Sequence, residues 1–287
     1  MTLTHTACHT GRLSSFLLGE MRLSAGLMNK LKWGTAIRVN GCPQRTNYPV
    51  SPGDVIEVDL LEPLPEYPPE EGDIAILYED DYLLAVDKPA GMLIHPSRGK
   101  NTGTLANLVW GYYQRSGQSC AYHPLTRLDR DTFGVVLLAK NAYTHALLQQ
   151  TPVEKIYHAL TFGGPEQEAG LIDAPIARRP LPSLLRYVDD SGKPSQTRYQ
   201  VLHRDGPICH LALTPCTGRT HQLRVHCAYM GWPILGDPQY GSEESQALSL
   251  EWGLHHQQLC AKVLRLPHPV TGQPLVLKSG MGVWQEK

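Results

Sequence analysis

The sequence predicts an α+β protein in which a small mixed domain precedes a larger, strand-rich domain. Two observations support this fold class. A stretch rich in proline and glutamate divides the chain, and on both sides of it segments alternate between apolar and polar residues, with helical patterns between them. A chain of 287 residues is long enough for one large domain, or for a large domain and a small one.

Two short helices and a few strands are expected at the N-terminus. The segment RLSSFLLGE has its apolar residues on one helical face, and Ser24 can cap a second helix that ends near Gly34. AIRVNG alternates into an Asn40-Gly41 turn, and the turn at Pro52-Gly53 leads into another alternating strand. We predict a small domain over residues 1–61.

The dividing stretch is EPLPEYPPEEGD, residues 62–73. Proline fixes φ and removes a backbone donor, and no apolar period survives here. We therefore expect a stiff, extended, acidic linker, followed by a large domain over residues 74–287.

Strands dominate the predicted large domain. IAILYEDDYLLAVDKPAGMLIHP predicts strand, turn, strand, turn and strand, and TRYQVLHR and ICHLALTP alternate as half-buried strands. THQLRVHCAYMG fits a helix better, with Leu223, Cys227 and Met230 on one face and Gly231 at its end. His221 and Arg224 would then lie on one side of this helix.

Composition narrows the class of protein. Lys and Arg number 26 against 27 Asp and Glu, so the chain lacks the basic excess that is typical of nucleic-acid-binding proteins. A local basic cleft would nevertheless be enough to bind a nucleic acid. The first residues do not resemble a signal peptide, and no apolar stretch approaches the roughly 18 residues of a membrane span. We expect a soluble, cytoplasmic monomer.

The cysteines indicate neither a zinc site nor a disulfide framework. They number seven, are scattered, and include no CxxC pair. Cys216, Cys227 and Cys260 are interpreted as small buried residues.

A group of charged residues stands before an apolar run in PLTRLDRDTFGVVLLAKN, residues 124–141. Arg127, Asp129, Arg130 and Asp131 precede a segment that has the composition of a buried strand. Taken alone, the pattern fits a surface turn whose charges pair with one another. It also fits functional charges at the mouth of a strand.

Several segments favour the functional interpretation. RLDRDTFG resembles the central motif of RluA-type pseudouridine synthases, usually HRLDxxTSG. KIYHALTFG is similar to that family's second motif, and TGRTHQLRVHCAYMGWPILGDPQYG to its third, with further matches in the expected order. The N-terminal order of helix, helix, strand, VNG and PGDVIEV resembles the small RNA-binding domain named after ribosomal protein S-four.

The resemblance implies a catalytic domain with a mixed, largely antiparallel central sheet, flanking helices and a central cleft. It implies an isomerase that flips a uridine out of RNA, cleaves its glycosidic bond and reattaches the base through carbon. This chemistry is redox-neutral, so no cofactor and no metal are expected. Large-subunit ribosomal RNA is the expected substrate, with transfer RNA second.

The resemblance also assigns the site. Asp129 is the catalytic carboxylate, acting as a nucleophile or as a base on the ribose, and Arg224 holds it ionised. Tyr157 stacks on the target base. The side chain of Arg127 is expected to point elsewhere than Asp129, since neighbouring side chains alternate along an extended chain, and Arg127 is therefore interpreted as structural or phosphate-contacting. The candidates for RNA contact are Arg127, Arg219, Thr220, His221, Gln222, Lys30, Lys32 and Arg38.

Some positions depart from the family pattern. Thr126 and Phe133 stand where histidine and serine are usual, and are expected to affect substrate choice more than chemistry. Two alternatives stay open: a catalytically silent RNA-binding or ribosome-assembly factor of the same fold, and an N-glycosidase that releases uracil without rejoining it.

Overall fold

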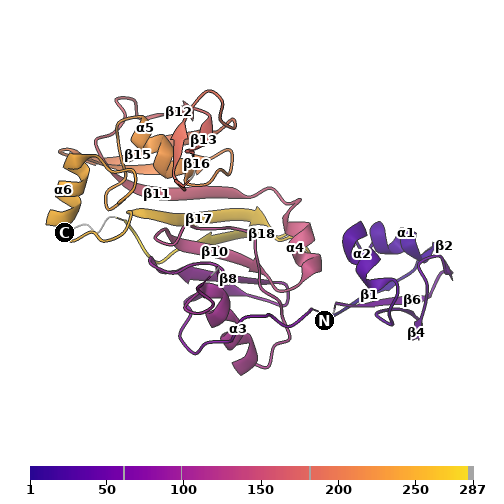
Figure 1. Ribbon diagram of the computed structural model, residues 1–287. Coiled ribbons are helices and arrows are strands. Elements are labelled where there is room, and N and C mark those ends of the chain that lie inside the picture. Colours follow the sequence, from indigo (N-terminus) through magenta and orange to yellow (C-terminus); the bar gives the residue numbers. More distant parts are fainter. Residues whose placement is uncertain (61, 98, 181, 284–287) are drawn as a thin grey trace.

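The structure is a computed structural model that describes residues 1–60, 62–97, 99–180 and 182–283. The expected domain ends at 61 and 287 lie outside the described residues. Figure 1 shows a small N-terminal part, in indigo, beside a much larger part. None of the helices formed by the described residues is long and apolar enough to cross a membrane.

The small part is an antiparallel sheet of four strands with two helices packed on it. The sheet has the order β1-β6-β3-β4, and a separate ribbon pairs β2 with β5. Its elements are β1 (Thr2–Thr6), β2 (Gly11–Arg12), α1 (Leu13–Leu18), α2 (Ala25–Leu31), β3 (Ile37–Val39), β4 (Cys42–Pro43), β5 (Pro49–Val50) and β6 (Val55–Asp59).

Local sequence signals account for these elements. The Ser24 hydroxyl accepts a hydrogen bond from the Leu27 amide at 3.1 Å, so the predicted cap of α2 is confirmed. Asn40 and Gly41 have φ values of 52° and 76°, the left-handed conformations that a tight two-residue hairpin requires. The strand β1 was not expected, because its threonines and single leucine give no clear apolar face.

A mixed sheet of ten strands forms the centre of the large part. Every pairing in it is antiparallel except that of β10 with β17. The predicted mixed, largely antiparallel sheet is therefore confirmed. In sheet order the strands are β12 (Ala169–Asp173), β15 (Gln196–Asp205), β16 (Ile208–Pro215), β11 (Glu154–Phe162), β17 (Leu259–Pro267), β10 (Phe133–Ala139), β8 (Leu83–Lys88) and β7 (Ile76–Glu79), with β18 (Pro274–Lys278) beside β17 and β9 (His123–Pro124) beside β10.

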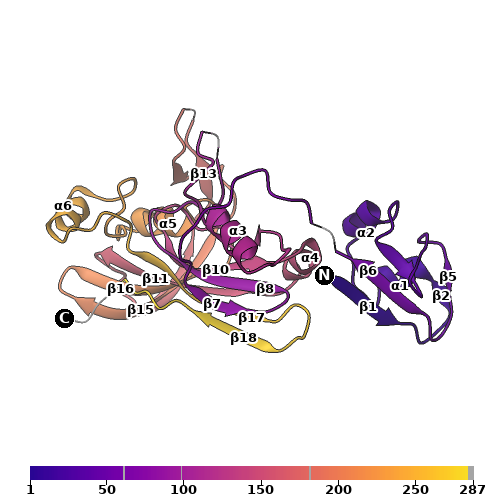
Figure 2. The same ribbon diagram turned by 90° about the horizontal axis from the view of Figure 1, so that it is seen from below.

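Helices flank this sheet. Figure 2 shows α3 (Leu105–Arg115) and α5 (Gln222–Tyr229) on the same face, while α6 (Glu243–Glu251) lies at one end. A short ribbon of β13 (Ile176–Arg178) and β14 (Arg186–Val188) contacts α5. The helix α4 (Ala142–Leu148) faces the small part (Figure 1).

Three expectations are wrong. The third strand expected after Lys88 does not form, because the chain turns at Gly91 and residue Leu93 makes only an isolated bridge. Met230 is 41% exposed, since α5 ends one residue earlier at Tyr229. Cys216 is exposed, because it follows the last residue of β16 at the edge of the sheet.

The acidic stretch after residue 61 is extended, but it is fixed to α3. Both carboxylate oxygens of Glu70 accept the Gly103 amide, at 2.8 and 3.0 Å. The Asn107 side chain donates to the Pro68 carbonyl at 2.8 Å, and Arg115 donates to the Gly72 carbonyl at 3.1 Å. The segment therefore docks on the large part and does not act as a free tether.

The small part also shares its core with the large part. Tyr143 and Leu147 of α4 belong to the same buried cluster as Phe16 and Leu17 of α1. Removing the small part would uncover these two side chains. A chain truncated near Ile74 would therefore lose core packing.

His210, in strand β16, makes the stability of the protein sensitive to acid. Burial, together with the nearby charges of His158, His203 and Lys262, lowers the pKa of His210 from 6.5 to about 4. Its Nε2 atom is buried with no hydrogen-bond partner within the described part of the chain. The unfolded chain therefore binds more protons between these two pKa values, so stability falls as pH drops through this window.

We expect His210→Leu to flatten this loss. The free energy of unfolding, measured with denaturant at several pH values across the window, should decline by about 1–2 kcal/mol less than in the wild type, a figure discounted for solvent screening. His255→Gln, at an exposed position, is the control. Equal acid sensitivity in His210→Leu and wild type would contradict the assignment.

Candidate active site

One cavity of about 630 Å³ opens on the face of the sheet that carries α5. Its walls come from three segments far apart in the sequence: the loop before β10, strand β11, and the stretch from the end of β16 into α5. The volume suits a nucleoside-sized ligand. Eight of the residues expected from sequence to act here line it: Arg127, Asp129, Tyr157, Arg219, Thr220, His221, Gln222 and Arg224.

Asp129 stands on the loop that enters the buried strand β10. Its backbone carbonyl accepts the Thr132 amide at 3.2 Å, which closes the turn, while its side chain stays 30% exposed toward the cavity. Gly134 fixes the start of the strand, with φ of 108°, because a Cβ there would collide with the backbone of Ala261 in β17. The turn and Gly134 therefore hold Asp129 in a fixed position just before β10.

Arg224 links Asp129 to a second, buried carboxylate. Its Nη1 donates to Asp129 Oδ2 at 3.1 Å, and its Nε and Nη2 donate to Asp237 at 2.7 and 2.8 Å. Nη2 also donates to Gln239 at 2.8 Å, and the guanidinium lies 4.9 Å from the ring centre of Tyr240. The arginine therefore cannot turn away from Asp129 without breaking several charge-assisted hydrogen bonds.

Burial would lower the pKa of Arg224, but the hydrogen bonds and charges of Asp237 and Asp129 outweigh it and raise the pKa. The Asp237 side chain is fully buried, and the side chain of Arg224 is 5% exposed. Asp237 therefore supplies the anchor that keeps a cation beside Asp129. Sequence reasoning missed Asp237, although it lies in the DPQYG end of the third motif.

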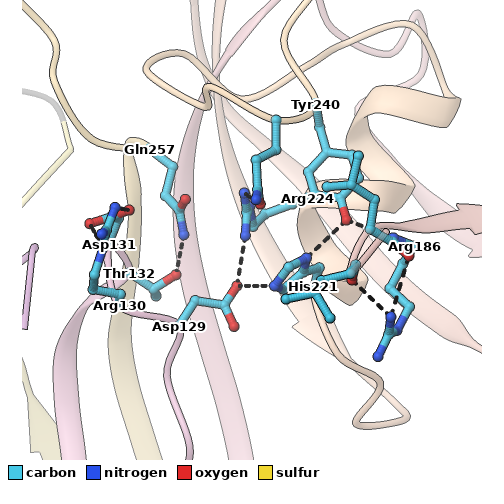
Figure 3. Close-up of polar contacts among 12 residues, drawn as sticks. Asp129, Arg130, Asp131, Thr132, Arg186, His221, Arg224, Tyr240 and Gln257 are labelled. Carbon is cyan, nitrogen blue, oxygen red and sulfur yellow. Dashed lines mark hydrogen bonds and ion pairs between the residues drawn. The ribbon is translucent and has the colours of Figure 1, made fainter. Parts of the chain in front are cut away.

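His221 approaches the same carboxylate oxygen of Asp129 as Arg224 does (Figure 3). It precedes α5 in the left-handed conformation, with φ of 58°, and its Nε2 lies 3.9 Å from Asp129 Oδ2. Its Nδ1 lies 2.9 Å from the Tyr240 hydroxyl, which accepts the Arg186 amide at 2.9 Å. The hydroxyl hydrogen can then point to Nδ1, which leaves hydrogen on Nε2, facing Asp129. Burial lowers the pKa of His221, although Asp129 opposes this, and the neutral ring is favoured.

A β-bulge aims Tyr157 into the cavity. Ile156 pairs with Val263 and Tyr157 with Ala261, so Lys262 is an extra residue in β17. Burial raises the pKa of Tyr157, and the charge of Asp129 raises it further, so the phenol is neutral beside the carboxylate. A neutral ring on a strand wall provides a stacking surface for a base.

Asp131 points away from the cavity (Figure 3). It forms a bidentate pair with Arg130 at 3.0 and 2.9 Å, and it lies 3.3 Å from His256 Nδ1. The next residue, Thr132, accepts a hydrogen bond from the buried Gln257 side chain at 2.7 Å. The two aspartates of RLDRD thus face different surroundings.

A buried lysine, which sequence reasoning missed, supports the loop that carries Asp129. Lys88 Nζ donates to the carbonyls of Pro89, Met92 and Arg130 at 2.8, 2.8 and 2.9 Å. Burial lowers its pKa to about 8, while the charges of Asp131 and Asp129 oppose the shift. It joins the turn after β8 to the loop that carries Asp129.

The other expected contact residues divide into two groups. Arg127 is exposed and lines the cavity with Asp129, which corrects the expectation that it points elsewhere: residues two apart share a side of an extended chain. Arg219 and Thr220 are exposed at the rim, although Arg219 donates to the Pro194 carbonyl at 3.2 Å. Gln222 is buried, and its amide bonds four protein groups, so its arrangement favours a structural role.

The basic residues of the small part differ in how far carboxylates of the same part already neutralise their charges. Arg38 forms hydrogen bonds to both carboxylate oxygens of Asp59 and an ion pair with Glu57, so its charge is largely neutralised. Lys30 is exposed. Lys32 and Arg45 flank the ring of Trp33, at 5.2 and 4.9 Å from its centre, and Trp33 is 73% exposed. An exposed aromatic between two cations is a signal that sequence reasoning passed over.

Comparison with known proteins agrees with this geometry. A family model described as RNA pseudouridylate synthase matches residues 82–229. "Ribosomal large subunit pseudouridine synthase C" of Vibrio vulnificus is 32% identical over 96% of this chain and 91% of its own. "Ribosomal large subunit pseudouridine synthase D" of Nitrosomonas europaea is 38% identical over 72% of this chain and 61% of its own.

Solved structures share the fold. The chain resembles "Human RNA Pseudouridylate Synthase Domain Containing 1" with a TM-score of 0.59 and 26% identity, over 74% of this chain and 86% of the other. It resembles "Human RNA Pseudouridylate Synthase Domain Containing 4" with a TM-score of 0.58 and 27% identity, over 72% and 88% of the two chains.

Proposed function

The chain belongs to the RNA pseudouridylate synthase family and is an RNA-modifying isomerase, and from this premise we propose that it converts uridines of large-subunit ribosomal RNA to pseudouridine. The observation that supports catalysis is the exposed carboxylate of Asp129, held by Arg224 inside a cavity of nucleoside size. Relatives named as large-subunit synthases C and D support the choice of RNA.

In this proposal the target uridine is flipped into the cavity, where its base stacks on Tyr157. Asp129 acts on the ribose, as nucleophile or as base, while Arg224 and the Nε2–H of His221 hold its carboxylate in position. Arg127, Arg219 and Lys155 on the walls and rim supply positive charge for the flanking phosphates. The bonds broken and formed balance within the nucleoside, so the step consumes no other reactant.

Mapping of pseudouridine in cellular RNA, with and without this gene, tests the proposal. We expect one or a few positions in large-subunit ribosomal RNA to lose the modification and to regain it when the wild-type gene is returned. Loss confined to transfer RNA would move the substrate to that class. An unchanged map would support the silent RNA-binding alternative, and release of free uracil in vitro would support an N-glycosidase.

We further propose that the small part, S-four-like in its motif order, contacts the RNA outside the cavity. Its surface for this purpose is the exposed Trp33 with Lys32 and Arg45, and not Arg38, whose charge the sheet already neutralises. Aromatic rings between cations suit unpaired bases and their phosphates. Because the small part packs on α4 and its linker docks on α3, this surface is held in place relative to the cavity.

Point variants of the full chain test this better than truncation does. We expect Trp33→Ala to weaken RNA binding by about 1–3 kcal/mol, the usual value of one base stacked on an aromatic ring. The double variant Lys32→Ala/Arg45→Ala should lower the slope of log affinity against log salt by about 1–2. Arg12→Ala, at an exposed position on β2, is the matched control. Binding and salt slope equal to wild type in both variants would remove this surface from RNA recognition.

A further inference from the structure

A cluster of metal-ligating side chains lies in the small part, on elements that the proposed chemistry does not use. His5 lies near the end of β1, Cys8 and His9 lie in the loop after β1, and Glu20 comes just after α1. Figure 1 shows both elements in the small part. One ligand atom from each of Cys8, His9 and Glu20 lies within 4.8 Å of the others. Among the described residues this is the one group of three or more such side chains that is close enough to share an ion.

The three side chains are close enough to converge on one ion after a small adjustment. Zinc bonds of about 2.0–2.3 Å to nitrogen, oxygen and sulfur separate neighbouring ligand atoms by about 3.3–3.6 Å. Cys8 Sγ lies 3.6 Å from His9 Nδ1, and His9 Nε2 lies 3.6 Å from Glu20 Oε1. These two contacts use different nitrogens of His9, so binding of one ion requires the ring to turn until a single nitrogen faces both the thiol and the carboxylate.

His5 holds Glu20 from the side opposite His9. His5 Nε2 lies 2.6 Å from Glu20 Oε2, while the other carboxylate oxygen, Oε1, faces His9. His5 does not belong to the group whose ligand atoms converge, so it serves as the partner of the Glu20 carboxylate and not as a ligand. A ligating carboxylate that a second group holds in this way is oriented before the ion binds.

The backbone of the loop that carries Cys8 and His9 is fixed in advance. The Ala7 amide donates to the Asp54 carbonyl at 2.9 Å, and the Ala7 carbonyl accepts the Gly53 amide at 2.8 Å, so the loop cannot drift. The His9 ring stacks on the buried Phe16 ring with centres 4.7 Å apart. A site with little freedom left to lose binds more tightly than a flexible one.

We propose that Cys8, His9 and Glu20 bind one zinc ion, with His5 holding the Glu20 carboxylate and a water in the fourth position. A thiolate, an imidazole and a carboxylate form a donor set for zinc and not for magnesium or calcium, which take oxygen ligands. The ion would join the loop after β1 to the end of α1. A unit of about 60 residues buries a limited core, and a structural ion adds stability to domains of that size. The sequence lacks CxxC spacing, so the arrangement becomes visible only when α1 brings Glu20 back to the loop.

Zinc titration of the full-length chain tests the site. The protein is stripped with a chelator, desalted, and titrated with Zn²⁺ against a chromogenic competitor. We expect one tightly bound equivalent in wild type and in Cys42→Ser, an exposed cysteine of the same small sheet, and none in Cys8→Ser or Glu20→Gln. No bound equivalent in wild type, or an equivalent that survives both site substitutions, would overturn the proposal.

Cobalt provides a second readout that identifies the ligand. Co²⁺ in this site should show a thiolate-to-metal charge-transfer band in wild type and Cys42→Ser that disappears in Cys8→Ser. The same ion should shield Cys8 from a thiol reagent while Cys42 reacts as before. A wild-type cobalt complex without that band would mean that Cys8 is not a ligand, and the proposed donor set would be wrong.

Discussion

Asp129→Asn should fold like the wild type and make no detectable pseudouridine. The substitution keeps the shape of the side chain and its contact with Arg224 Nη1, but removes the charge that acts on the ribose. Loss of a single essential group in an active site commonly costs at least about 10⁴-fold in rate. The measurement is single-turnover formation of pseudouridine in an RNA substrate, with the thermal midpoint as the check on folding.

Asp131→Asn is the matched control, two residues away on the same loop. Its carboxylate pairs with Arg130 and His256, outside the cavity, so substantial activity should remain. Burial opposes ionisation of Asp131, but the hydrogen bond and charge of Arg130 lower its pKa, so the substitution costs some stability at neutral pH. An active Asp129→Asn with an inactive Asp131→Asn would show that the roles of the two aspartates are reversed.

Arg224→Met should reduce both turnover and stability severely. It leaves Asp237 buried without its cation, and breaking one member of a buried pair typically costs about 3–5 kcal/mol. If the lost orientation of Asp129 raises the activation free energy by a similar amount, about 3–5 kcal/mol, turnover falls by about 100-fold to several thousand-fold. Both quantities are measured on the same preparation, by single-turnover kinetics and by thermal unfolding.

Arg224→Lys separates charge from geometry. A lysine keeps the positive charge but cannot reach Asp129, Asp237 and Gln239 together, because it lacks the planar fork. We expect stability closer to wild type and turnover between those of wild type and Arg224→Met. Full turnover in Arg224→Met, with only stability reduced, would limit Arg224 to a structural role.

The sequence by itself determined most of the local structure and the chemistry to be tested. Side-chain period identified β15 and β16, and an apolar run indicated the buried strand β10. Capping and turn residues identified α2 and the Asn40-Gly41 hairpin, because these features depend on neighbours along the chain. The order of motifs indicated the family, which the comparisons show. Strand β1 was not predicted, because its own residue pattern does not indicate a strand and it forms one by pairing with β6.

The tertiary structure decided how those pieces act on one another. Asp237 becomes the buried anchor of Arg224, and Lys88 the support of the Asp129 loop, only when strands distant in sequence pair. Charges that look alike in the sequence then differ: Arg38 is neutralised by its sheet, while Arg45 stays exposed beside Trp33. The physical reason is that burial, and the partner each charge meets, are set by contacts between distant residues, and no local period encodes them.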